Sequence, residues 1–578
     1  MQAHQNFSRI CLFIAAAWML LAGLFYYPKW QKPGSESTLS WDVNGYYSYL
    51  PAALIYRDLR GLGYRDSINR KYQPASSNYE AFRDSASGNY VMKYASGMSF
   101  AYLPFFAVGH SIAKVGGWPA DGYSAPYQAA IGIGSLLVSL LALFLFHRLL
   151  RRYFAPVPTG ILILLYVFGT NYLEYAAITN AMTHGYLFEM YCALLLCTIR
   201  YYESPTLKRA MGIGALVGWM ALIRPTEVAV LLLVLGWGVG SRTALAERFR
   251  FFAARPGQLA GAAVAMLLVG TIQLIYWKYV TGHWLVYSYQ EEGFHFTHPH
   301  FDDCLWSFRK GWLLYTPLMI LALIGFGALW RKSRALFWPT LLYTFLFCYI
   351  AFSWSTWWYG GGLGQRALIQ IYPVVAFPFA ALLERAHRRW MQAAIGVFAV
   401  VCVYYNLWLH HQAHRGGLLE PEYMTYAYWK KILFRYEVPD DARKLLDADY
   451  EFNGTPACAE TVFQRDTVEI QPGTEFTSIT KVLPAPGKAW VRVYVTAATP
   501  DREWDLWKYH QLCMQDWKGG VVAGANQMRI ERLLANGGPR TMWLDLKRKD
   551  ERDSVEVYIY NPGSSKPLLL TGVKIIAF

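Results

Sequence analysis

The stretch STLSWDVNGYYSYLPA, residues 38–53, places one carboxylate, Asp42, among aromatic side chains. Connecting loops are usually built from Gly, Ser, Pro and charged residues, so a half-aromatic loop is expected to lie against an apolar surface. The stretch closely follows the first hydrophobic segment of the chain. We therefore expect Asp42, with Tyr46 and Tyr47 beside it, to be held near a membrane surface, although an Asp in such a loop can also serve only as a helix cap.

Cationic side chains recur at the ends of later hydrophobic segments. Lys93 begins KYASGMSFAYLPFF, Arg224 lies in ALIRPTE, and Arg366 ends WWYGGGLGQR. His184, in TNAMTHGYLFE, lies at the start of another segment. Lysine and arginine at such positions often only anchor a helix by extending toward headgroups, and a histidine can cap a helix. A structural interpretation therefore stands beside a substrate-binding one for each of the four residues.

A third group lies in EEGFHFTHPHFDD, residues 291–303. His295, His298, His300 and Asp302 bring imidazole and carboxylate ligands together within eight residues, and such ligands could bind a divalent metal such as Mg²⁺ or Mn²⁺. Their spacing matches no fixed metal motif. We therefore assign no metal site or cofactor, and keep these four residues as weak metal candidates.

The composition indicates an integral membrane protein. Of 578 residues, 54% are hydrophobic and 16% charged, which departs from soluble proteins. The net charge of +15 fits basic loops on one side of a bilayer better than a nucleic-acid partner, which we exclude. The eight cysteines contain no CxxC pair. Cys458 and Cys513 could form a disulfide if their domain is extracytoplasmic.

Runs of about 20 apolar residues predict membrane-spanning helices. Clear candidates are 10–27, 126–147, 158–174, 184–201, 257–277, 311–330, 337–353, 366–384 and 391–409. The run 209–240 is too long for one helix, and we expect two short spans broken near IRPTE, residues 223–227. This gives about eleven spans. The first has no cleavage site and is interpreted as an uncleaved anchor.

Five basic clusters separate these runs, and the positive-inside rule places all of them in the cytoplasm. Their members lie at 148–152, 208–209, 242–255, 331–334 and 385–389. The two short spans then carry Arg224 and Glu227 to the outer face. With the N-terminus also cytoplasmic, residues 28–125 form a large first external loop, in which 94–115 is expected to be a helix lying in the outer membrane interface.

The residues after 410 differ in composition and are also expected outside. AWVRVYVTAA (489–498) and SVEVYIYNPG (554–563) alternate apolar and polar residues, which is typical of half-buried antiparallel strands. Residues 423–436 read as an amphipathic interfacial helix. We predict a transmembrane domain over 1–414 and an extracytoplasmic β-sandwich over 415–578, which could bind glycan or only brace the loops.

Taken together, these residues resemble the GT-C superfamily of membrane glycosyltransferases. The similarity covers roughly residues 10–410 and rests on the acid in WDVNGYYSYLPA, on KYASGMSFAYLPFF, on ALIRPTE and on GGGLGQRALIQIYP. The second stretch resembles a juxtamembrane helix of bacterial aminoarabinose transferases and protein mannosyltransferases. Unlike the mannosyltransferases, this chain has no second acid directly after Asp42.

The resemblance implies a polytopic α-helical fold and a multi-pass protein of a bacterial inner membrane. It also implies an inverting transfer of a sugar from polyprenyl phosphate (undecaprenyl phosphate) to a glycan, lipid or protein acceptor on the extracytoplasmic side. Asp42 would be the general base, while Lys93 and, more speculatively, Arg366 would contact the phosphate. His184, Arg224, Tyr46 and Tyr47 would complete the substrate-binding set.

Two other classes of function stay open at this point. A transporter or flippase of lipid-linked glycans would carry ionisable residues near the bilayer midplane and paired repeats. Here the predicted spans are nearly free of charge except at their ends, which favours an enzyme. A non-catalytic glycan-binding scaffold would leave the polar residues without a chemical role, and would tolerate replacement of Asp42.

Overall fold

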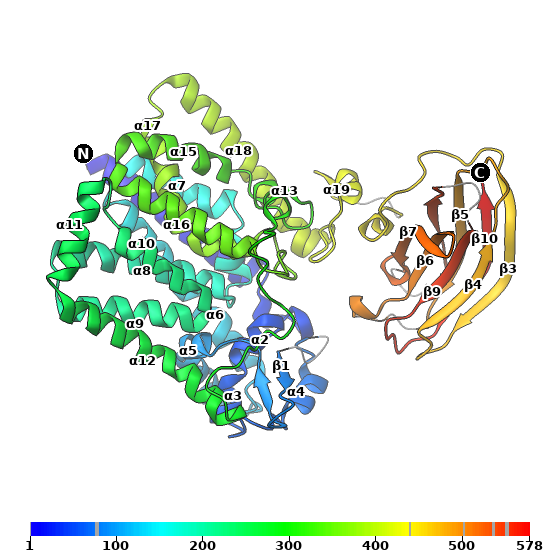
Figure 1. Cartoon of the computed structure of the whole chain (residues 1–578), viewed down its shortest axis with the longest axis horizontal. Coiled ribbons are helices and arrows are strands. Elements are labelled where there is room, and N and C mark those ends of the chain that lie inside the picture. The colour runs from blue at the N-terminus through cyan, green and yellow to red at the C-terminus, as the bar shows by residue number, and fades with distance from the viewer. Residues whose placement is uncertain are drawn as a thin grey trace. The chain divides into compact units, whose positions relative to one another are not determined.

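The computed structural model describes residues 2–75, 80–437, 441–500, 503, 505–534, 538–549 and 554–578, with side chains from residue 6 onward. The chain divides into two compact units, Met1–His410 and His411–Phe578. The first unit is a bundle of helices, and the second consists mainly of β-strands (Figure 1).

The helices of the first unit follow the hydrophobic runs of the sequence. They are α1 (Gln2–Leu21), α2 (Trp41–Tyr47), α3 (Tyr49–Leu54), α4 (Arg65–Tyr72), α5 (Gly97–Val115), α6 (Ala125–Leu150), α7 (Pro156–Gly169), α8 (Thr183–Glu203), α9 (Leu207–Ile223), α10 (Leu231–Gly236), α11 (Arg242–Ala253), α12 (Pro256–Thr281), α13 (Phe301–Trp306), α14 (Trp312–Tyr315), α15 (Met319–Lys332), α16 (Arg334–Phe352), α17 (Tyr372–Arg385) and α18 (Arg389–His411). Three short helical turns matter for the site: η4 (Glu174–Ile178), η5 (Pro225–Val230) and η6 (Arg366–Ile371). A small hairpin pairs β1 (Ala81–Arg83) with β2 (Tyr90–Met92).

Six helices in the described part of the chain are long and apolar enough to cross a membrane, and the protein is a multi-pass membrane protein. They contain α1, α6, α12, α16, α17 together with η6, and α18. The other five predicted spans correspond to α7, α8, α9, α10 and α15, which do not meet the same criteria of length and hydropathy. The count of eleven spans therefore stays a prediction.

The predicted break in the run 209–240 is confirmed. Helix α9 ends at Ile223, Arg224 is extended with φ −141° and ψ 116°, and Pro225 opens η5. Proline removes a backbone donor and pushes the residue before it out of the helical region, so one helix cannot continue through this point. The side chain of Glu227, which was predicted at the outer face together with Arg224, is fully buried, and neighbouring side chains donate hydrogen bonds to its carboxylate. The side of the membrane on which it lies stays a prediction.

The five basic clusters gather at one end of the helical unit. Contacts that join them are Arg152 with Glu203, Lys332 with Glu384, and Arg248 stacked 3.5 Å over the ring of Tyr202. The start of α1 lies at the same end, since Ser8 contacts His147 at 3.1 Å. This grouping is what the positive-inside rule requires, while the assignment of this end to the cytoplasm stays a prediction.

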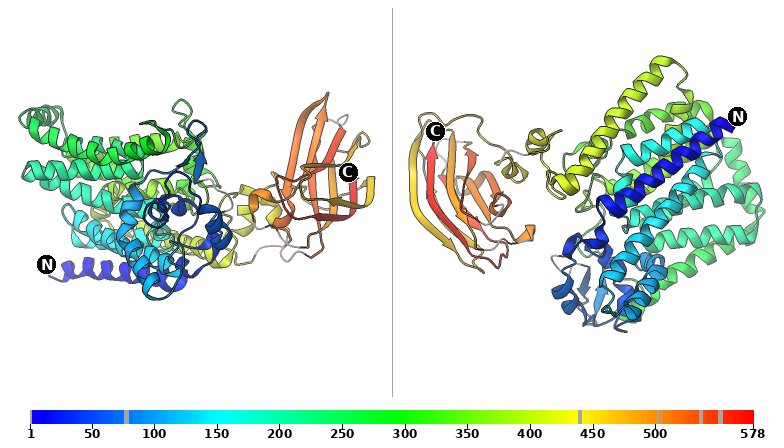
Figure 2. Two further views of the ribbon diagram at one scale, coloured as in Figure 1. Left: turned by 90° about the horizontal axis from the view of Figure 1, so that it is seen from below. Right: turned by 180° about the vertical axis from the view of Figure 1, so that it is seen from behind.

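The segment between α1 and α6 folds back onto the helical unit. The backbone N–H of Ser96 donates to Gln273 of α12 at 2.9 Å, and the N–H of Met92 donates to the hydroxyl of Tyr276 at 3.0 Å. Residues 94–115, predicted as an interfacial helix, contain α5, which is not among the six long apolar helices. Figure 2 shows α1 and the segment after it, in dark blue, from two further directions.

Helix α5 begins in direct backbone contact with the end of α9. A Cβ atom on Gly97 would lie 2.5 Å from the backbone nitrogen of Ile223 and 2.6 Å from the carbonyl oxygen of Leu222. The indole of Trp219 also donates to the carbonyl of Gly97 at 2.9 Å. Only glycine fits at this position without a shift, because the backbone atoms of Leu222 and Ile223 leave no room for a side chain.

The second unit is a β-sandwich. Its two antiparallel sheets have the orders β3-β10-β5-β8 and β4-β9-β6-β7. The strands are β3 (Glu460–Ile470), β4 (Phe476–Val482), β5 (Trp490–Ala498), β6 (Gln511–Lys518), β7 (Val521–Arg529), β8 (Arg540–Lys547), β9 (Ser554–Tyr560) and β10 (Leu568–Ala577). Alternate residues of β5 and β9, including Val493 and Val557, are buried in the core of the unit.

The strands predicted at 489–498 and 554–563 are confirmed as β5 and β9. Within the predicted interfacial helix, residues 426–432 form α19 (Tyr426–Ile432). The disulfide considered between Cys458 and Cys513 does not form. Cys513 is buried in β6, Cys458 is exposed, and both are free thiols.

The contact at Gly97 predicts a strong effect of one added methyl group. The Gly97→Ala variant should lower the melting temperature of the detergent-purified protein by several degrees, because the start of α5 must move away from α9. Gly117→Ala is not a matched control, because its φ is positive, so Gly212→Ala, which meets no atom within 4 Å, serves instead. Equal melting temperatures for the two variants would contradict the packing argument.

Candidate functional site

Asp42 is held by two donors from distant parts of the chain. Its Oδ1 accepts a hydrogen bond from the Tyr94 hydroxyl at 2.8 Å, and its Oδ2 forms an ion pair with Arg366 Nη2 at 2.6 Å. The Asp42 and Arg366 side chains are 16% and 13% exposed, respectively. The pair is thus largely but not completely removed from water, which strengthens the attraction between the two charges.

Local backbone geometry brings Asp42 to this place. Trp41, which starts α2, has a left-handed φ of 50°, and its N–H donates to the carbonyl of Pro74 at 3.0 Å. Gly45, one turn further along, allows the ring of Tyr94 to press against the helix, since a Cβ there would lie 2.4 Å from that ring. The absence of a side chain at Gly45 therefore makes room for the tyrosine that donates to Asp42.

A glycine-rich loop places Arg366 at the start of η6. Gly362 and Gly364 have φ values of 133° and 64°, which residues with a side chain rarely adopt. Arg366 Nη1 donates back to the carbonyl of Gly361 at 3.2 Å, and the hydroxyl of Tyr175 contacts Leu363. The glycines therefore form a tight support for the guanidinium group rather than a phosphate-binding loop.

Arg224 and Tyr46 extend the site beyond the ion pair. Tyr46 is buried and packs against Tyr94, with ring centroids 4.4 Å apart and the rings tilted by 34°. The charges of Arg224, Asp42 and Arg366 all act on its hydroxyl, so these four side chains lie close together. The Nε atoms of Arg224 and Arg366 are buried and have no hydrogen-bond acceptor. Two buried guanidinium donors without acceptors are what an anionic ligand would satisfy.

Lys93 lies at the edge of this group. Its Nζ forms an ion pair with Glu292 at 2.6 Å and lies 5.6 Å from the ring centroid of Tyr289 and 5.9 Å from that of Tyr94. Tyr289 in turn is within range of the charges of Arg224 and Asp42. The structure therefore brings Lys93 near the site, with a carboxylate partner that the sequence did not suggest.

His184 is fully buried at the start of α8, behind the two arginines. Its Nδ1 lies 3.1 Å from Gln370 Oε1, and Gln370 Nε2 donates to Glu227 Oε1 at 2.5 Å. The other oxygen of Glu227 accepts from the hydroxyl of Tyr191 at 2.6 Å. His184 Nε2 is buried without a hydrogen-bond partner. These residues form a buried polar chain that leads from the arginines into the helical unit.

Tyr47 is the one predicted substrate-binding residue that the structure turns away from the site. Its hydroxyl donates to the carbonyl of Gly122 at 2.5 Å, and its ring packs against Tyr102, Phe106 and Tyr123. The reason is helical geometry, because consecutive residues of α2 point about 100° apart. Tyr46 faces the arginines, so its neighbour faces the core.

The weak metal candidates are not gathered into a ligand set. Among the residues that the structure describes, no group of three or more His, Cys, Asp or Glu side chains is arranged to hold a metal ion. His300 lies 3.5 Å from Asp303, while His298 contacts the hydroxyl of Thr297 at 2.9 Å. His295 and Asp302 join no such group.

Glu80 is a site residue that sequence reasoning missed. It is 4% exposed, accepts from Asn44 at 3.2 Å and lies 3.4 Å from Arg65 Nη2. Burial, with a smaller contribution from the charge of Asp42, raises the pKa of the Glu80 carboxyl to about 7. The chain thus does have a second acid near Asp42, although 38 residues separate the two in sequence. No local pattern around Glu80 marks it, since only the fold brings it beside α2.

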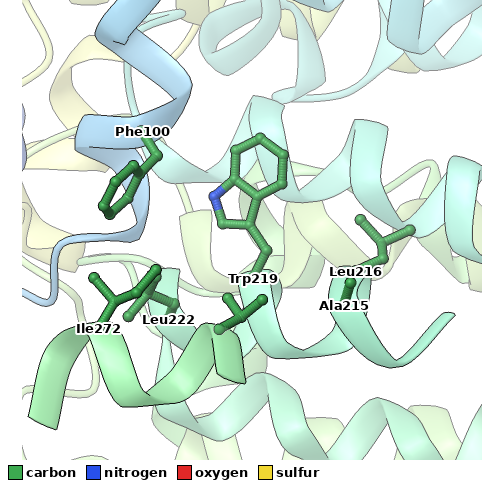
Figure 3. Close-up of a pocket in the computed structure, with 7 residues that line it drawn as sticks. Phe100, Ala215, Leu216, Trp219, Leu222 and Ile272 are labelled. Atoms are coloured by element: carbon green, nitrogen blue, oxygen red, sulfur yellow. The ribbon is translucent and has the colours of Figure 1, made fainter. Parts of the chain in front are cut away.

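An apolar cavity of about 360 Å³ opens between α5, α9 and α12. Figure 3 shows Phe100, Trp219, Leu222 and Ile272 among the side chains that line it. Ala215, Leu216 and Val269 complete the lining. The lining residues that α9 contributes lie in the half of the helix that ends next to Arg224.

Comparisons with known proteins give distant similarities only. No family model matches the sequence, and no curated protein matches it. The apo oligosaccharyltransferase of Archaeoglobus fulgidus aligns with a TM-score of 0.42 and 12% identity, over 73% of this chain and 57% of that one. The arabinosyltransferase EmbB of Mycobacterium smegmatis aligns with a TM-score of 0.31 and 11% identity, over 81% of this chain and 59% of that one. The chain thus spans less than two thirds of either length, and similarities this remote do not establish an activity.

Burial of Glu80 predicts a pH-dependent stability. Because its folded pKa of about 7 lies above the ordinary value of 4.5, the folded protein holds an extra proton between these values. Its contribution to stability therefore falls as the pH rises from about 4.5 to 7, by on the order of 3 kcal/mol. Glu80→Gln should remove this dependence. The melting temperature of the variant minus that of wild type should therefore be larger at pH 8 than at pH 5.5. The control is Glu291→Gln, which changes an exposed glutamate. Parallel curves for wild type and Glu80→Gln would refute the prediction.

Proposed function

We propose that this protein is a membrane glycosyltransferase that moves a sugar from a polyprenyl-phosphate donor, such as undecaprenyl phosphate, to an acceptor hydroxyl or amine. The observation that carries the proposal is the partly buried pair of Asp42 and Arg366, with Arg224 beside it. Both arginines lie at the opposite ends of their helices from the basic clusters, since α9 starts at Leu207 and α17 ends at Arg385. The charged site and the basic clusters would then face opposite sides of the membrane.

Asp42 supplies the proton acceptor in this proposal. The acceptor oxygen or nitrogen attacks the anomeric carbon and gives its proton to the carboxylate, while the bond from that carbon to the phosphate oxygen breaks and its electron pair leaves with the phosphate. Attack from the face opposite the leaving group inverts the anomeric centre, and no covalent intermediate forms. The hydrogen bond from Tyr94 and the ion pair with Arg366 hold the carboxylate in one orientation.

The unsatisfied guanidinium groups supply the phosphate contacts. Arg224 and Arg366 each keep a buried Nε–H without an acceptor, and phosphate oxygens accept such bonds strongly. The negative charge on the phosphate increases as the sugar leaves, so donors placed beforehand around it lower the barrier. Lys93, paired with Glu292 at the rim of the site, could contact the phosphate if the ligand displaces this carboxylate.

The apolar cavity beside α9 fits the hydrocarbon chain of such a donor. It is lined by apolar side chains and lies on the same helix that ends at Arg224. A lipid whose tail lies in this cavity would bring its phosphate to the arginines. A water-soluble nucleotide sugar would leave the cavity without a role.

Replacing the carboxylate tests the proposal directly. Purified Asp42→Asn should transfer sugar from a radiolabelled polyprenyl-phosphate donor at least about 100-fold more slowly than wild type, because the proton acceptor is lost. Asp58→Asn, an acid bonded to nearby backbone N–H groups of the same external segment, is the matched control. The same assay with EDTA, and with Mg²⁺ or Mn²⁺ added back, tests the metal candidates. Wild-type activity of Asp42→Asn would overturn the catalytic role and favour a scaffold.

Filling the cavity should weaken long-chain donors selectively. Ile272→Trp should raise the KM for an undecaprenyl donor about tenfold, because it occupies the space of several tail carbons. A donor with only two isoprene units should be affected less than twofold. Leu267→Trp, at a side chain of α12 that is 62% exposed, is the control. An equal change for both donors would show that the tail binds elsewhere.

A transporter of lipid-linked glycans is the second candidate, because Glu227 is fully buried within the apolar segment Pro225–Gly236. Transporters often place ionisable residues at such depth. Purified protein in liposomes separates the two: a transporter would move a fluorescent lipid-linked sugar between leaflets without cleaving it. Sugar transfer without such movement would support the enzyme.

The surroundings of the site are part of the same proposal. We place the protein in a bacterial inner membrane, with the N-terminus cytoplasmic and the β-sandwich periplasmic. Its acceptor would be a glycan, a lipid or a protein on that side. The β-sandwich would bind glycan or brace the neighbouring loops.

A further inference from the structure

We propose that His184 is a third ligand of the donor phosphate, and that it takes up a proton when the phosphate binds. This inference rests on the proposed function, because it concerns the same anion site. It goes further by naming a proton-coupled ligand and the side chains that control its tautomer.

The first step of the argument is the hydrogen-bond direction along the buried chain. Glu227 accepts from Tyr191 and from Gln370 Nε2, so the amide of Gln370 must turn its oxygen toward His184. An amide oxygen is only an acceptor. The Nδ1 of His184 therefore carries the hydrogen, and in the neutral ring Nε2 carries a lone pair.

The second step is the pairing of charges around the ring. Among the described residues, the charged groups that act directly on the imidazole are Arg224, before η5, and Arg366, at the start of η6. Tyr175 of η4 packs edge-on at 5.3 Å, and Glu227 reaches the ring only through Gln370. Two positive charges disfavour a third, so the ring is neutral in the empty site.

The third step concerns the three buried atoms that lack partners. Arg224 Nε and Arg366 Nε are donors without acceptors, and His184 Nε2 has no partner at all. Leaving a buried polar atom without a partner is energetically costly. The three side chains also act electrostatically on one another. An anion would accept from both guanidinium donors and also offset their charge, which a neutral hydroxyl would not do.

A bound phosphate reverses the electrostatic balance at the ring. Its negative charge offsets the two arginines and favours the protonated imidazole, whose Nε2–H then donates to a phosphate oxygen. The Nδ1–H bond to Gln370 is the same in both states, so the ring need not turn. The proton comes from solvent and returns to it when the lipid phosphate leaves, so no bond other than N–H forms or breaks.

The test is calorimetry on the full chain purified in detergent. The probe is a farnesyl phosphate methyl diester, which keeps one negative charge between pH 6 and 8 and does not itself titrate. Apparent binding enthalpies in two buffers with different ionisation enthalpies give the protons taken up per ligand. We expect close to one proton for wild type, and a Kd that rises about tenfold per pH unit while the empty ring is neutral. His184→Gln should take up none and bind with a pH-independent Kd.

His410→Gln is the matched control, because it removes another buried imidazole of the helical unit and should leave the proton uptake unchanged. A second measurement, NMR of the histidine nitrogens, can be made on the wild-type protein alone. In protein with ¹⁵N-labelled histidine, one Nε2 signal should move from the unprotonated to the protonated range when the diester is added. The signal missing from His184→Gln identifies it.

The outcomes separate this inference from the proposed function. Binding of the diester by wild type without proton uptake, or uptake that persists in His184→Gln, overturns the role of His184 and leaves the lipid-phosphate site standing. A wild-type protein that binds neither this diester nor farnesyl phosphate overturns the proposed donor class and the inference with it.

Discussion

The ion pair between Asp42 and Arg366 connects the two parts of the helical unit that the site requires. One partner lies on the short helix α2, between α1 and α6, and the other opens η6 at the start of the apolar span Arg366–Arg385. Breaking such a pair by removing one partner typically costs about 3–5 kcal/mol, because the remaining charge is left in a poorly solvated place. The pair therefore fixes the position of the loop as well as the orientation of the carboxylate.

Charge balance at the site is uneven in a way that suits an anionic ligand. Asp42 neutralises one guanidinium, Glu292 neutralises Lys93, and Glu227 is engaged by Tyr191 and Gln370. Arg224 has no ion pair among the described residues. The empty site thus carries surplus positive charge in a region of low dielectric, which is costly unless a ligand compensates it. Part of the binding energy of a phosphate would come from relieving this cost.

Hydrophobic patterning predicted most of the helical unit and the strands of the sandwich, because burial dictates periodicity. Pro225 revealed the break after α9 for the same local reason. Asp42, Arg224 and Arg366 were recognisable because a charge beside an apolar run is costly. Glu80 and Gln370 were not, since their importance comes from partners 36 and 186 residues away in the sequence. Tyr47 was misplaced because adjacent aromatic residues look alike until the direction of each along the helix is known.

The contact between Gly97 and α9 has a consequence for how this protein could diversify. Trp219 forms a wall of the apolar cavity and also bonds the backbone of the residue that begins α5. Lys93, four residues before Gly97, lies at the edge of the charged site, and the next residue, Tyr94, donates a hydrogen bond to Asp42. Altering the cavity to accept a different lipid would therefore shift the segment that positions the carboxylate. Under the proposed function, lipid preference and catalytic geometry would therefore be coupled, and a change in one would require compensating substitutions in the other.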